Sequence, residues 1–348
     1  MASLLLWLSV ASVSAVRLGE VTLSRHRSAA IMHRTRIPWS VRCCALPEDS
    51  PSDSSDEIEC DPTGNCDVPS TMGDAEEDRL RLKTDLLRLA AACSRGEAAT
   101  NLDRDTARTL VSSLEMLNPT PEPTRSPICV GTWELVFSDT QLFRSSPFFM
   151  AGRAVCADGD EARRYDWFCD MHRAALAIST VGKVRQIVSE ERVTSEFEVR
   201  VGAIPFLTDF LPPIRYSGGA PLVIEGTIVS SATIDSNSGD GWNLLMDTVE
   251  VKGSNIPLLR QALDSGVKLQ TRQLGSLLEQ VVPSYANPTP AFRTTYLDED
   301  LRISRDQDGK LFVYSRLSGD TNPTQYEDKA SDLGLGQLME GLVAGFMG

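Results

Sequence analysis

The chain has 348 residues, of which 41 % are hydrophobic and 24 % are charged, an ordinary balance for a globular protein. Its formal net charge of −14 argues against a nucleic-acid partner, because phosphate binding needs a basic surface. Only three histidines occur (His26, His33 and His172), so a metal site built from several histidines lacks support, as does a serine–histidine–aspartate triad.

Residues 1–45 are expected to be a two-part targeting segment. Residues 4–13 form an apolar run that is too short to span a membrane, and the small residues Val13-Ser14-Ala15 follow it as in a cleaved signal peptide. The six arginines of residues 1–45 and a single acid give a net charge of +5, as in a transit peptide. Such a combination is the address of plastids bounded by extra membranes; mitochondrial import and secretion are the alternatives.

Residues 46–74 are acidic, rich in serine and proline, and poor in large apolar residues, which predicts a disordered linker. The eight cysteines of the chain form no C-x-x-C pair, so zinc ribbons and thioredoxin-like chemistry lack support. Cys60 and Cys66 lie within this linker, either as a redox-sensitive pair or, the interpretation we favour, as incidental thiols.

Two helices are predicted within residues 75–118. The first places apolar residues at helical spacing, and Gly96 is expected to stop it: Leu82, Leu86, Leu89, Ala90 and Cys93. The second has a similar stripe of Ala107, Leu110, Val111, Leu114 and Leu117. Asn118-Pro119 should end it, since the residue before proline avoids the helical conformation.

From residue 128 to residue 317 the apolar period changes from that of a helix to that of a strand. In GTWELVFS (131–138), Trp133, Leu135 and Phe137 alternate with more polar residues, as in a half-buried strand. Further strands are predicted at 174–179, 184–189, 193–201, 222–234 and 242–251, with a turn at 237–241 between the last two. Many short strands separated by turns indicate a sandwich or a barrel.

A helical pattern interrupts the strands at residues 271–282, where apolar residues recur at helical spacing: Leu274, Leu277, Leu278, Val281 and Val282. One interpretation is a lid or a lipid-surface helix. The other, which we favour, is a helix that plugs or covers the barrel, because any packed helix shows such a stripe.

The last part of the region is expected to be a hairpin, 300–305 with 310–316, around the turn Asp306-Gln307-Asp308-Gly309. Alternation extended backward puts one set of residues on a single face: Phe292, Tyr296, Asp298, Asp300 and Arg302. We expect an ion pair between Asp300 and Arg302. A carboxylate metal site and a glycosidase pair both find weak support, so neither a metal nor a cofactor is predicted.

Two aromatic stretches could form the mouth of a barrel or a rim that touches a membrane. One is 146–150, with Phe148 and Phe149, and the other is 204–213, with Phe206. Buried loop anchors are the equally weighted alternative. Residues 318–348 are taken as a C-terminal tail.

Several segments together resemble the plastid lipid-associated protein, or fibrillin, family: NPTPEPT (118–124), GTWELVFSDTQLFRSSPFF (131–149), GSNIPLLRQALD (253–264) and FRTTYLDEDLRISRDQDGKLFVYSR (292–316). The resemblance covers about residues 80–317 and weakens over 151–192, which looks like an insertion or a divergent segment. It implies a mainly β fold with N-terminal helices (α+β), a lipocalin-like antiparallel β-barrel with an inserted helix before the last hairpin.

The resemblance also implies binding of lipophilic molecules and association with plastoglobules and thylakoids, without an established set of catalytic residues. Gly131-Thr132-Trp133 matches the G-x-W of a first lipocalin strand, in which an arginine covers the tryptophan; Arg302 or Arg316 is the candidate. The expected ligand-binding residues are Trp133, Phe137, Phe148, Phe149, Phe206, Tyr296, Asp298, Asp300 and Arg302.

The leading hypothesis is a non-enzymatic plastid protein that binds or buffers a prenylquinone, a carotenoid or a fatty acyl lipid at a plastoglobule or thylakoid surface. One alternative is a structural coat of lipid droplets, and another is a scaffold for an isoprenoid-synthesising enzyme. An enzyme is the last hypothesis. It predicts a concave site with carboxylates of shifted pKa, and a cluster of Tyr296, Asp298 and Asp300 inside such a pocket would support it.

Overall fold

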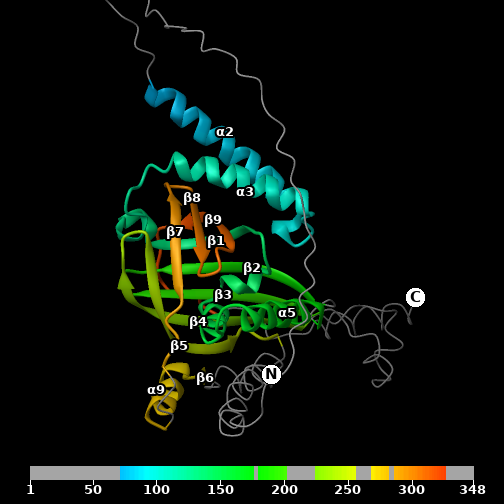
Figure 1. Ribbon diagram of the computed structural model, residues 1–348, viewed down its shortest axis with the longest axis vertical. Coiled ribbons are helices and arrows are strands. Elements are labelled where there is room, and N and C mark those ends of the chain that lie inside the picture. Colours follow the sequence, from blue (N-terminus) through cyan, green and yellow to red (C-terminus); the bar gives the residue numbers. More distant parts are fainter. Residues whose placement is uncertain (1–70, 176–178, 202–223, 256–267, 282–285, 327–348) are drawn as a thin grey trace, which may run out of the picture. The chain divides into compact units, whose positions relative to one another are not determined.

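The computed structural model describes residues 71–175, 179–201, 224–255, 268–281 and 286–326 (Figure 1). The chain divides into two units, Met1–Thr71 and Met72–Gly348, and nearly all described residues belong to the second. The targeting segment, residues 46–70 of the acidic linker with Cys60 and Cys66, the aromatic stretch 204–213 with Phe206, and most of the tail lie outside the described residues. Residues 71–74, which were expected to belong to the disordered linker, begin the helix Thr71–Ala92.

Two helices precede the strands, as predicted. Helix α2 is Thr71–Ala92 and helix α3 is Asn101–Met116. Thr100 caps α3: its hydroxyl accepts from the backbone N–H of Asp103, whose carboxylate accepts in return from the N–H of Thr100. Between the helices, the short turn η1 (Ser94–Gly96) ends on Gly96 with φ of 95°. A left-handed residue is therefore present where the sequence predicted a stop.

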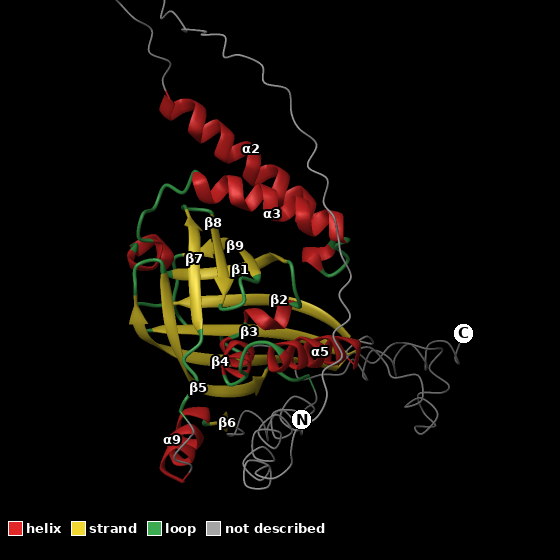
Figure 2. Ribbon diagram, viewed as in Figure 1, coloured by secondary structure: helices red, strands yellow, loops and turns green. Residues whose placement is uncertain are grey.

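Eight strands close into an antiparallel barrel in the order β4-β3-β2-β1-β9-β8-β7-β5, with β5 pairing back onto β4 (Figures 1 and 2). The two-residue strand β6 is added to β5. The strands are β1 Gly131–Ser138, β2 Ser179–Val188, β3 Arg192–Val201, β4 Ile224–Asn237, β5 Gly241–Lys252, β6 Lys268–Leu269, β7 Ala291–Leu297, β8 Leu301–Asp306 and β9 Leu311–Ser318. The mainly β fold with N-terminal helices is confirmed.

The closing hairpin also forms as predicted. Strands β8 and β9 pair through Arg302 with Tyr314 and through Ser304 with Phe312. The turn between them contains Gly309 with φ of 73°, a conformation that glycine adopts without a steric penalty.

The prediction of two separate strands at 174–179 and 184–189 is wrong. Ala174 and Ala175 end helix α5, and residues 179–188 form the single strand β2. Gly182 lies at a register irregularity between Val181 and Val184. A Cβ at Gly182 would stand 2.4 Å from the carboxylate of Glu198, so the strand approaches its neighbour closely there.

Two helices that were not predicted follow β1. After the turn η4 (Leu142–Ser145), α4 is Pro147–Ala154 and α5 is Asp160–Ala175. The aromatic stretch 146–150 is thus the start of a helix. The predicted helix before the last hairpin is present as α9, Thr271–Val281, but its Leu277 and Val281 are 55 % and 71 % exposed. The stripe is therefore only partly buried, which weakens the interpretation of α9 as a simple cover.

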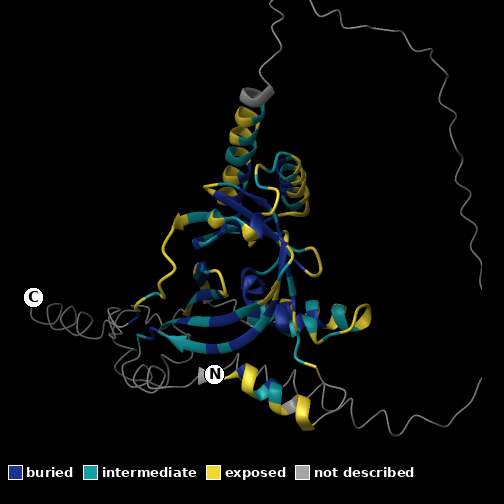
Figure 3. Cartoon of the chain, turned by 90° about the vertical axis from the view of Figure 1, so that its left-hand side faces the viewer, coloured by how far each residue is buried: buried dark blue, intermediate teal, exposed yellow. Residues whose placement is uncertain are grey.

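The buried apolar residues form two clusters, one on each face of the barrel wall. Figure 3 shows how buried and exposed residues are distributed along the chain. Residues of seven barrel strands and of α4 and α5 make up the first cluster, which is therefore the interior. The second lies between α2, α3 and the outer faces of β7, β8 and β9: it joins Leu86, Val111, Leu114, Ile303 and Val313 among others. The two helices are thus fixed against the outside of the closing hairpin.

Candidate functional site

The barrel interior is mainly apolar, and β8 is the strand whose inward residues are all polar. The lining of the interior includes Trp133, Leu135, Val193, Phe197, Ala232, Trp242, Leu244, Phe292, Phe312 and Tyr314, all at most 5 % exposed. Strand β8 instead turns Arg302, Ser304 and Asp306 inward, since Leu301 and Ile303 join the outer cluster. A mainly apolar barrel interior that contains a buried arginine is therefore the most distinctive feature of the described fold.

Arg302 is completely buried in this interior. Its guanidinium lies over the rings of Trp133 and Tyr314, with centroid distances of 5.2 Å and 4.4 Å. Its Nη2 donates to Oε1 of Gln186 at 2.5 Å. Strands β8, β9, β1 and β2 thus bring together one cation, two aromatic rings and one amide.

Arg316 also covers Trp133, with 5.2 Å from guanidinium to ring centroid. It donates from Nη1 to the carbonyl oxygen of Ile128 and from Nη2 to that of Val130, the latter at 3.0 Å. The indole N–H of Trp133 donates to the carbonyl of Cys129 at 2.9 Å. The sequence named Arg302 or Arg316 as the residue over the tryptophan, and the structure places both there.

The expected single face of Phe292, Tyr296, Asp298, Asp300 and Arg302 does not form. A register irregularity between Thr294 and Tyr296 shifts the alternation, so Phe292 points into the barrel and Tyr296 joins the outer cluster. The expected ion pair of Asp300 with Arg302 is also wrong. Asp300 pairs instead with Lys83 of α2, at 3.1 Å.

Lys83, Asp298 and Tyr296 form a latch between α2 and the β7–β8 turn. Lys83 Nζ lies 2.8 Å from Oδ2 of Asp298, which also accepts from the Tyr296 hydroxyl at 2.6 Å. Oδ1 of Asp298 accepts from the backbone N–H groups of Asp300 and Leu301. Burial opposes the charge of Asp298, but these hydrogen bonds, first that of Lys83, hold its pKa below the usual value.

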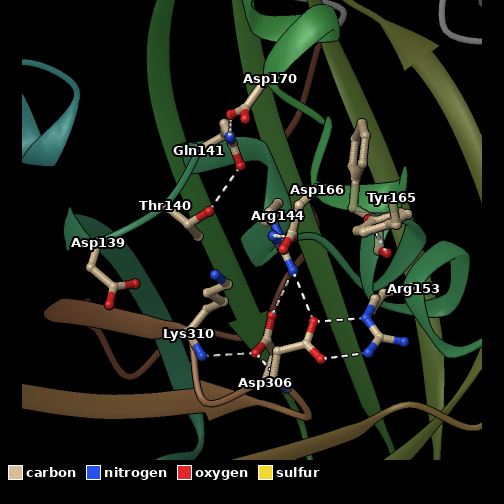
Figure 4. A network of polar contacts seen from close by, with 12 residues as sticks. Asp139, Thr140, Gln141, Arg144, Arg153, Tyr165, Asp166, Asp170, Asp306 and Lys310 are labelled. Atoms are coloured by element: carbon tan, nitrogen blue, oxygen red, sulfur yellow. Dashed lines mark hydrogen bonds and ion pairs between the residues drawn. The ribbon is translucent and has the colours of Figure 1, made fainter. Parts of the chain in front are cut away.

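A second polar network ties the β8–β9 turn to the helices that follow β1 (Figure 4). Arg144, 2 % exposed, donates to Asp166 at 2.6 Å and to Asp308 at 3.2 Å, and lies 3.5 Å from Asp306. Arg153, 3 % exposed, contacts both oxygens of Asp308 at 2.8 Å, a bidentate pair. Burial raises the pKa of Asp306 even though Arg144 and two backbone N–H groups oppose that shift.

The aromatic residues proposed as a rim lie partly inside the molecule. Phe148 and Phe149 are half-buried and pack against the interior cluster, and Phe149 contacts Phe143 with ring centroids 4.5 Å apart. Phe137, after an irregularity in β1, joins the outer cluster. His172 lies in α5 among aromatic rings, and burial lowers its pKa.

Of the nine expected binding residues, the structure brings Trp133 and Arg302 together inside the barrel, with Phe148 and Phe149 against the same cluster. Tyr296, Asp298 and Asp300 meet one another on the outer side. Sequence reasoning missed Gln186, whose only signal was a polar residue at an inward position of an apolar strand, and Lys83, which had none.

The described residues hold no group of three or more histidine, cysteine, aspartate or glutamate side chains placed for a metal ion. Nor does this part of the chain include a helix of the length and apolarity that a membrane crossing requires.

A closed antiparallel barrel with an apolar interior, and with an arginine over the tryptophan of its first strand, defines a lipocalin-like protein. The PAP_fibrillin family model matches residues 80–315, and the chain belongs to this family of plastid lipid-associated proteins. Membership supports a lipid-associated role and a plastid location.

Curated proteins that are similar to the chain are also named plastid lipid-associated proteins. The chain is 24 % identical over 280 residues to a plastid-lipid-associated protein, chloroplastic, of Citrus unshiu, covering 75 % of this chain and 77 % of the relative. It is 29 % identical over 248 residues to probable plastid-lipid-associated protein 2 of Arabidopsis thaliana, covering 68 % and 71 %. Plastid lipid-associated protein 1 of Brassica campestris is 27 % identical over 253 residues, with 70 % and 69 % covered. No solved structure gives a significant match.

Proposed function

We propose that the chain binds or buffers a lipophilic molecule inside its barrel, at the surface of plastoglobules or thylakoids. The observation that carries the proposal is the interior cluster, to which seven barrel strands contribute apolar side chains. Such an interior suits a prenylquinone, a carotenoid or a fatty acyl chain, since apolar surface gains free energy when it leaves water.

A catalytic role is not part of the proposal. Tyr296, Asp298 and Asp300 do meet, but around Lys83 at the α2 contact. The pKa of Asp298 is lowered, and burial raises that of Tyr296, so each keeps its ordinary ionisation state at neutral pH. Neither group is therefore poised to exchange a proton, which favours a structural use of the cluster.

A second candidate is a structural coat or scaffold protein of lipid droplets, which could hold an isoprenoid-synthesising enzyme. It is favoured by the chain that follows β1, because Phe143, Met150 and Phe149 pack into the same cluster as the strands. Side chains that fill the barrel permanently would leave the protein to act through its outer surface.

Tryptophan fluorescence distinguishes a lipid-binding barrel from a coat or scaffold protein whose barrel is filled. Trp133 and Trp242 lie in the interior with 0 % and 2 % exposure, whereas Trp167 is 65 % exposed. A Trp167→Phe variant of the full chain, titrated with decylubiquinone, should lose fluorescence saturably, because a bound quinone would quench the interior rings. Trp242→Phe in the same background shows how much of the signal arises there.

Palmitic acid and β-carotene are tested by competition with the quinone, and native mass spectrometry of the protein isolated from its plastids looks for retained lipid. Absence of bound lipid together with absence of binding by all three probes would refute the proposal and favour the coat protein. In that case the protein should still float with plastoglobules and retain protein partners in a pull-down.

A further inference from the structure

Arg302 carries a buried positive charge without a counter-charge. Within the described residues no carboxylate forms an ion pair with it, and only Nη2 has an acceptor, Gln186 Oε1. Nε and Nη1 are buried and lack acceptors there. A buried charge without a partner is strongly unfavourable, so an acceptor is expected at this position.

The nearest side chains do not neutralise Arg302. Burial raises the pKa of the Cys129 thiol, although Arg302 acts in the opposite direction, so the thiol stays protonated at neutral pH. Burial likewise raises the pKa of Tyr314, which keeps its phenolic proton. Cys129 and Tyr314 are therefore both uncharged, and neither neutralises the positive charge of Arg302.

The same level of the barrel has further donors. Arg302 pairs across the sheet with Tyr314, and Gln186 pairs with Trp133 on one side and with Ser195 on the other. The hydroxyl groups of Tyr314 and Ser195 are buried and have no hydrogen-bond partner within the described ranges. This level of the interior therefore holds unpaired hydroxyl groups, each able to donate one hydrogen bond, beside the unpaired nitrogens of Arg302.

The other buried arginines of the described chain show how the fold usually treats such a group. Arg144 and Arg153 each contact at least two carboxylates. Arg316, which is only half-buried over the same tryptophan as Arg302, donates to two backbone carbonyls. Arg316 already holds the end of β9 against residues 128–130. The burial of a second arginine, Arg302, is therefore not explained by a need to close the barrel.

We propose that Arg302 and Tyr314 bind the carboxylate of a fatty acid whose chain lies along the apolar interior. The inference rests on the proposed function and names its ligand class. One unpaired guanidinium matches one negative charge, which a carboxylate carries, whereas a phosphate monoester carries nearly two. A carboxylate has several acceptor sites, enough for the free nitrogens of Arg302 and the hydroxyl of Tyr314.

The test compares ligands that differ only in their head group. Palmitic acid and hexadecanol are competed separately against decylubiquinone on the full chain, with the quenching of tryptophan as the readout. The acid is expected to bind at least about tenfold more tightly than the alcohol, because its hydrogen bonds to Arg302 are charge-assisted.

Three variants locate the effect. Arg302→Met should abolish the preference for the acid and leave the affinity for the alcohol within about threefold. Arg302→Lys, which keeps the charge, should retain part of the preference, and Tyr314→Phe should reduce it by about three- to tenfold. Arg316→Met is the matched control: it removes a cation from the same ring, and the ratio of acid to alcohol affinity should remain that of the original chain.

Each remaining outcome is informative. Equal affinities for acid and alcohol overturn the inference and leave the proposed function standing. Failure of quinone, acid and alcohol alike to bind refutes the proposed function, and the inference with it. Competition by millimolar phosphate or acetate as effective as that of palmitate would show a site for small anions and would overturn the lipid assignment.

Thermal unfolding of each variant confirms that the barrel is folded, and Arg302→Met should unfold at no lower temperature, since it removes an unpaired buried charge.

Discussion

At the scale of single residues, position in the barrel wall decides what a charged side chain does. Lys83 and Asp298 pair across the outer face at 2.8 Å with 14 % and 17 % of their side chains exposed. Arg302, next to the same turn but on the inner face, has one amide as its acceptor. Neighbours in sequence thus have opposite roles, one fastening a helix and the other facing the apolar interior.

The latch gives a prediction for Asp298→Asn. The amide keeps an oxygen for the turn N–H groups but loses the charge that Lys83 needs, so the free energy of unfolding at pH 7 should fall by about 1–3 kcal/mol. The pKa of Asp298 is lowered on folding, so its contribution is present above its ordinary value near 3.8 and is lost as the pH falls through the folded value. Urea unfolding at pH 7 and pH 3 should therefore show a smaller difference between variant and original chain at pH 3.

Asp85→Asn on the same helix is the control, because its partner Arg88 is 75 % exposed, and it should change stability by less than about 0.5 kcal/mol. An equal loss for Asp298→Asn at both pH values would mean that the charge of Asp298 is not what stabilises the contact. At high pH the stability of the latch is limited by loss of the proton of Lys83. Burial opposes the charge of Lys83, but Asp298 and Asp300 raise its pKa overall, so the latch should weaken above about pH 10.5.

At the scale of elements, irregularities in three strands set which side chains face inward. In β7 the shift between Thr294 and Tyr296 sends the tyrosine outward, and in β1 the shift between Leu135 and Phe137 does the same for the phenylalanine. Both rings then pack under α2 and α3. A third shift in β2 surrounds Gly182. Such bulges bend and twist a strand, which is how a short barrel closes.

The turn between α2 and α3 also depends on a single residue, Gly96. Gly96 has φ of 95°, and a Cβ there would stand 1.9 Å from the carbonyl oxygen of Ser138. Gly96→Ala should therefore lower the free energy of unfolding by at least about 2 kcal/mol, through backbone strain and displacement of β1.

Gly159→Ala is the matched substitution for thermal unfolding experiments. Gly159 also has positive φ, 82°, but a Cβ would meet nothing within 4 Å, so only the backbone strain of about 1–2 kcal/mol should appear. If the two variants lose the same stability, the contact of Gly96 with Ser138 does not determine the helix position.

At the scale of the whole described molecule, the barrel is held together by contacts between segments far apart in the chain. Strand β1 pairs with β2 and with β9, which joins the beginning of the barrel to its end. The network of Arg144, Arg153 and Asp308 then fastens α4 and α5 to the β8–β9 turn (Figure 4). The divergent segment is thereby part of the barrel rather than an appended loop.

Asp308→Asn tests this connection. It leaves Arg144 and Arg153 with fewer carboxylates in a buried setting, so stability should fall by about 1–3 kcal/mol. Amide hydrogen exchange should quicken mainly in α4 and α5, since the network fixes those helices. Asp235→Asn, an exposed carboxylate on β4, is the control and should change neither quantity. Uniformly faster exchange over all strands would contradict a local role.

The amino-acid sequence by itself determined the local elements: α2 and α3, most strands, the turns at 237–241 and 306–309, the family, and Trp133 covered by arginine. The helices, strands and turns depend on spacing over a few residues, which periodicity reports directly. The family, and the arginine over Trp133, came instead from the resemblance of whole segments. The sequence did not predict α4 and α5, whose faces carry too little apolar contrast, and it predicted two strands, 174–179 and 184–189, where β2 is continuous.

Tertiary structure alone decided which charges meet. Lys83 and Asp298 are 215 residues apart, and Arg302 and Gln186 are 116 apart, so neither contact has a local signal. A bulge of one residue reverses every later side chain of a strand, and alternation extended across it therefore assigns the wrong face. Asp300 lies in the turn ahead of β8 and pairs with Lys83, whereas Arg302 is inside β8 and faces inward, although only one residue separates them.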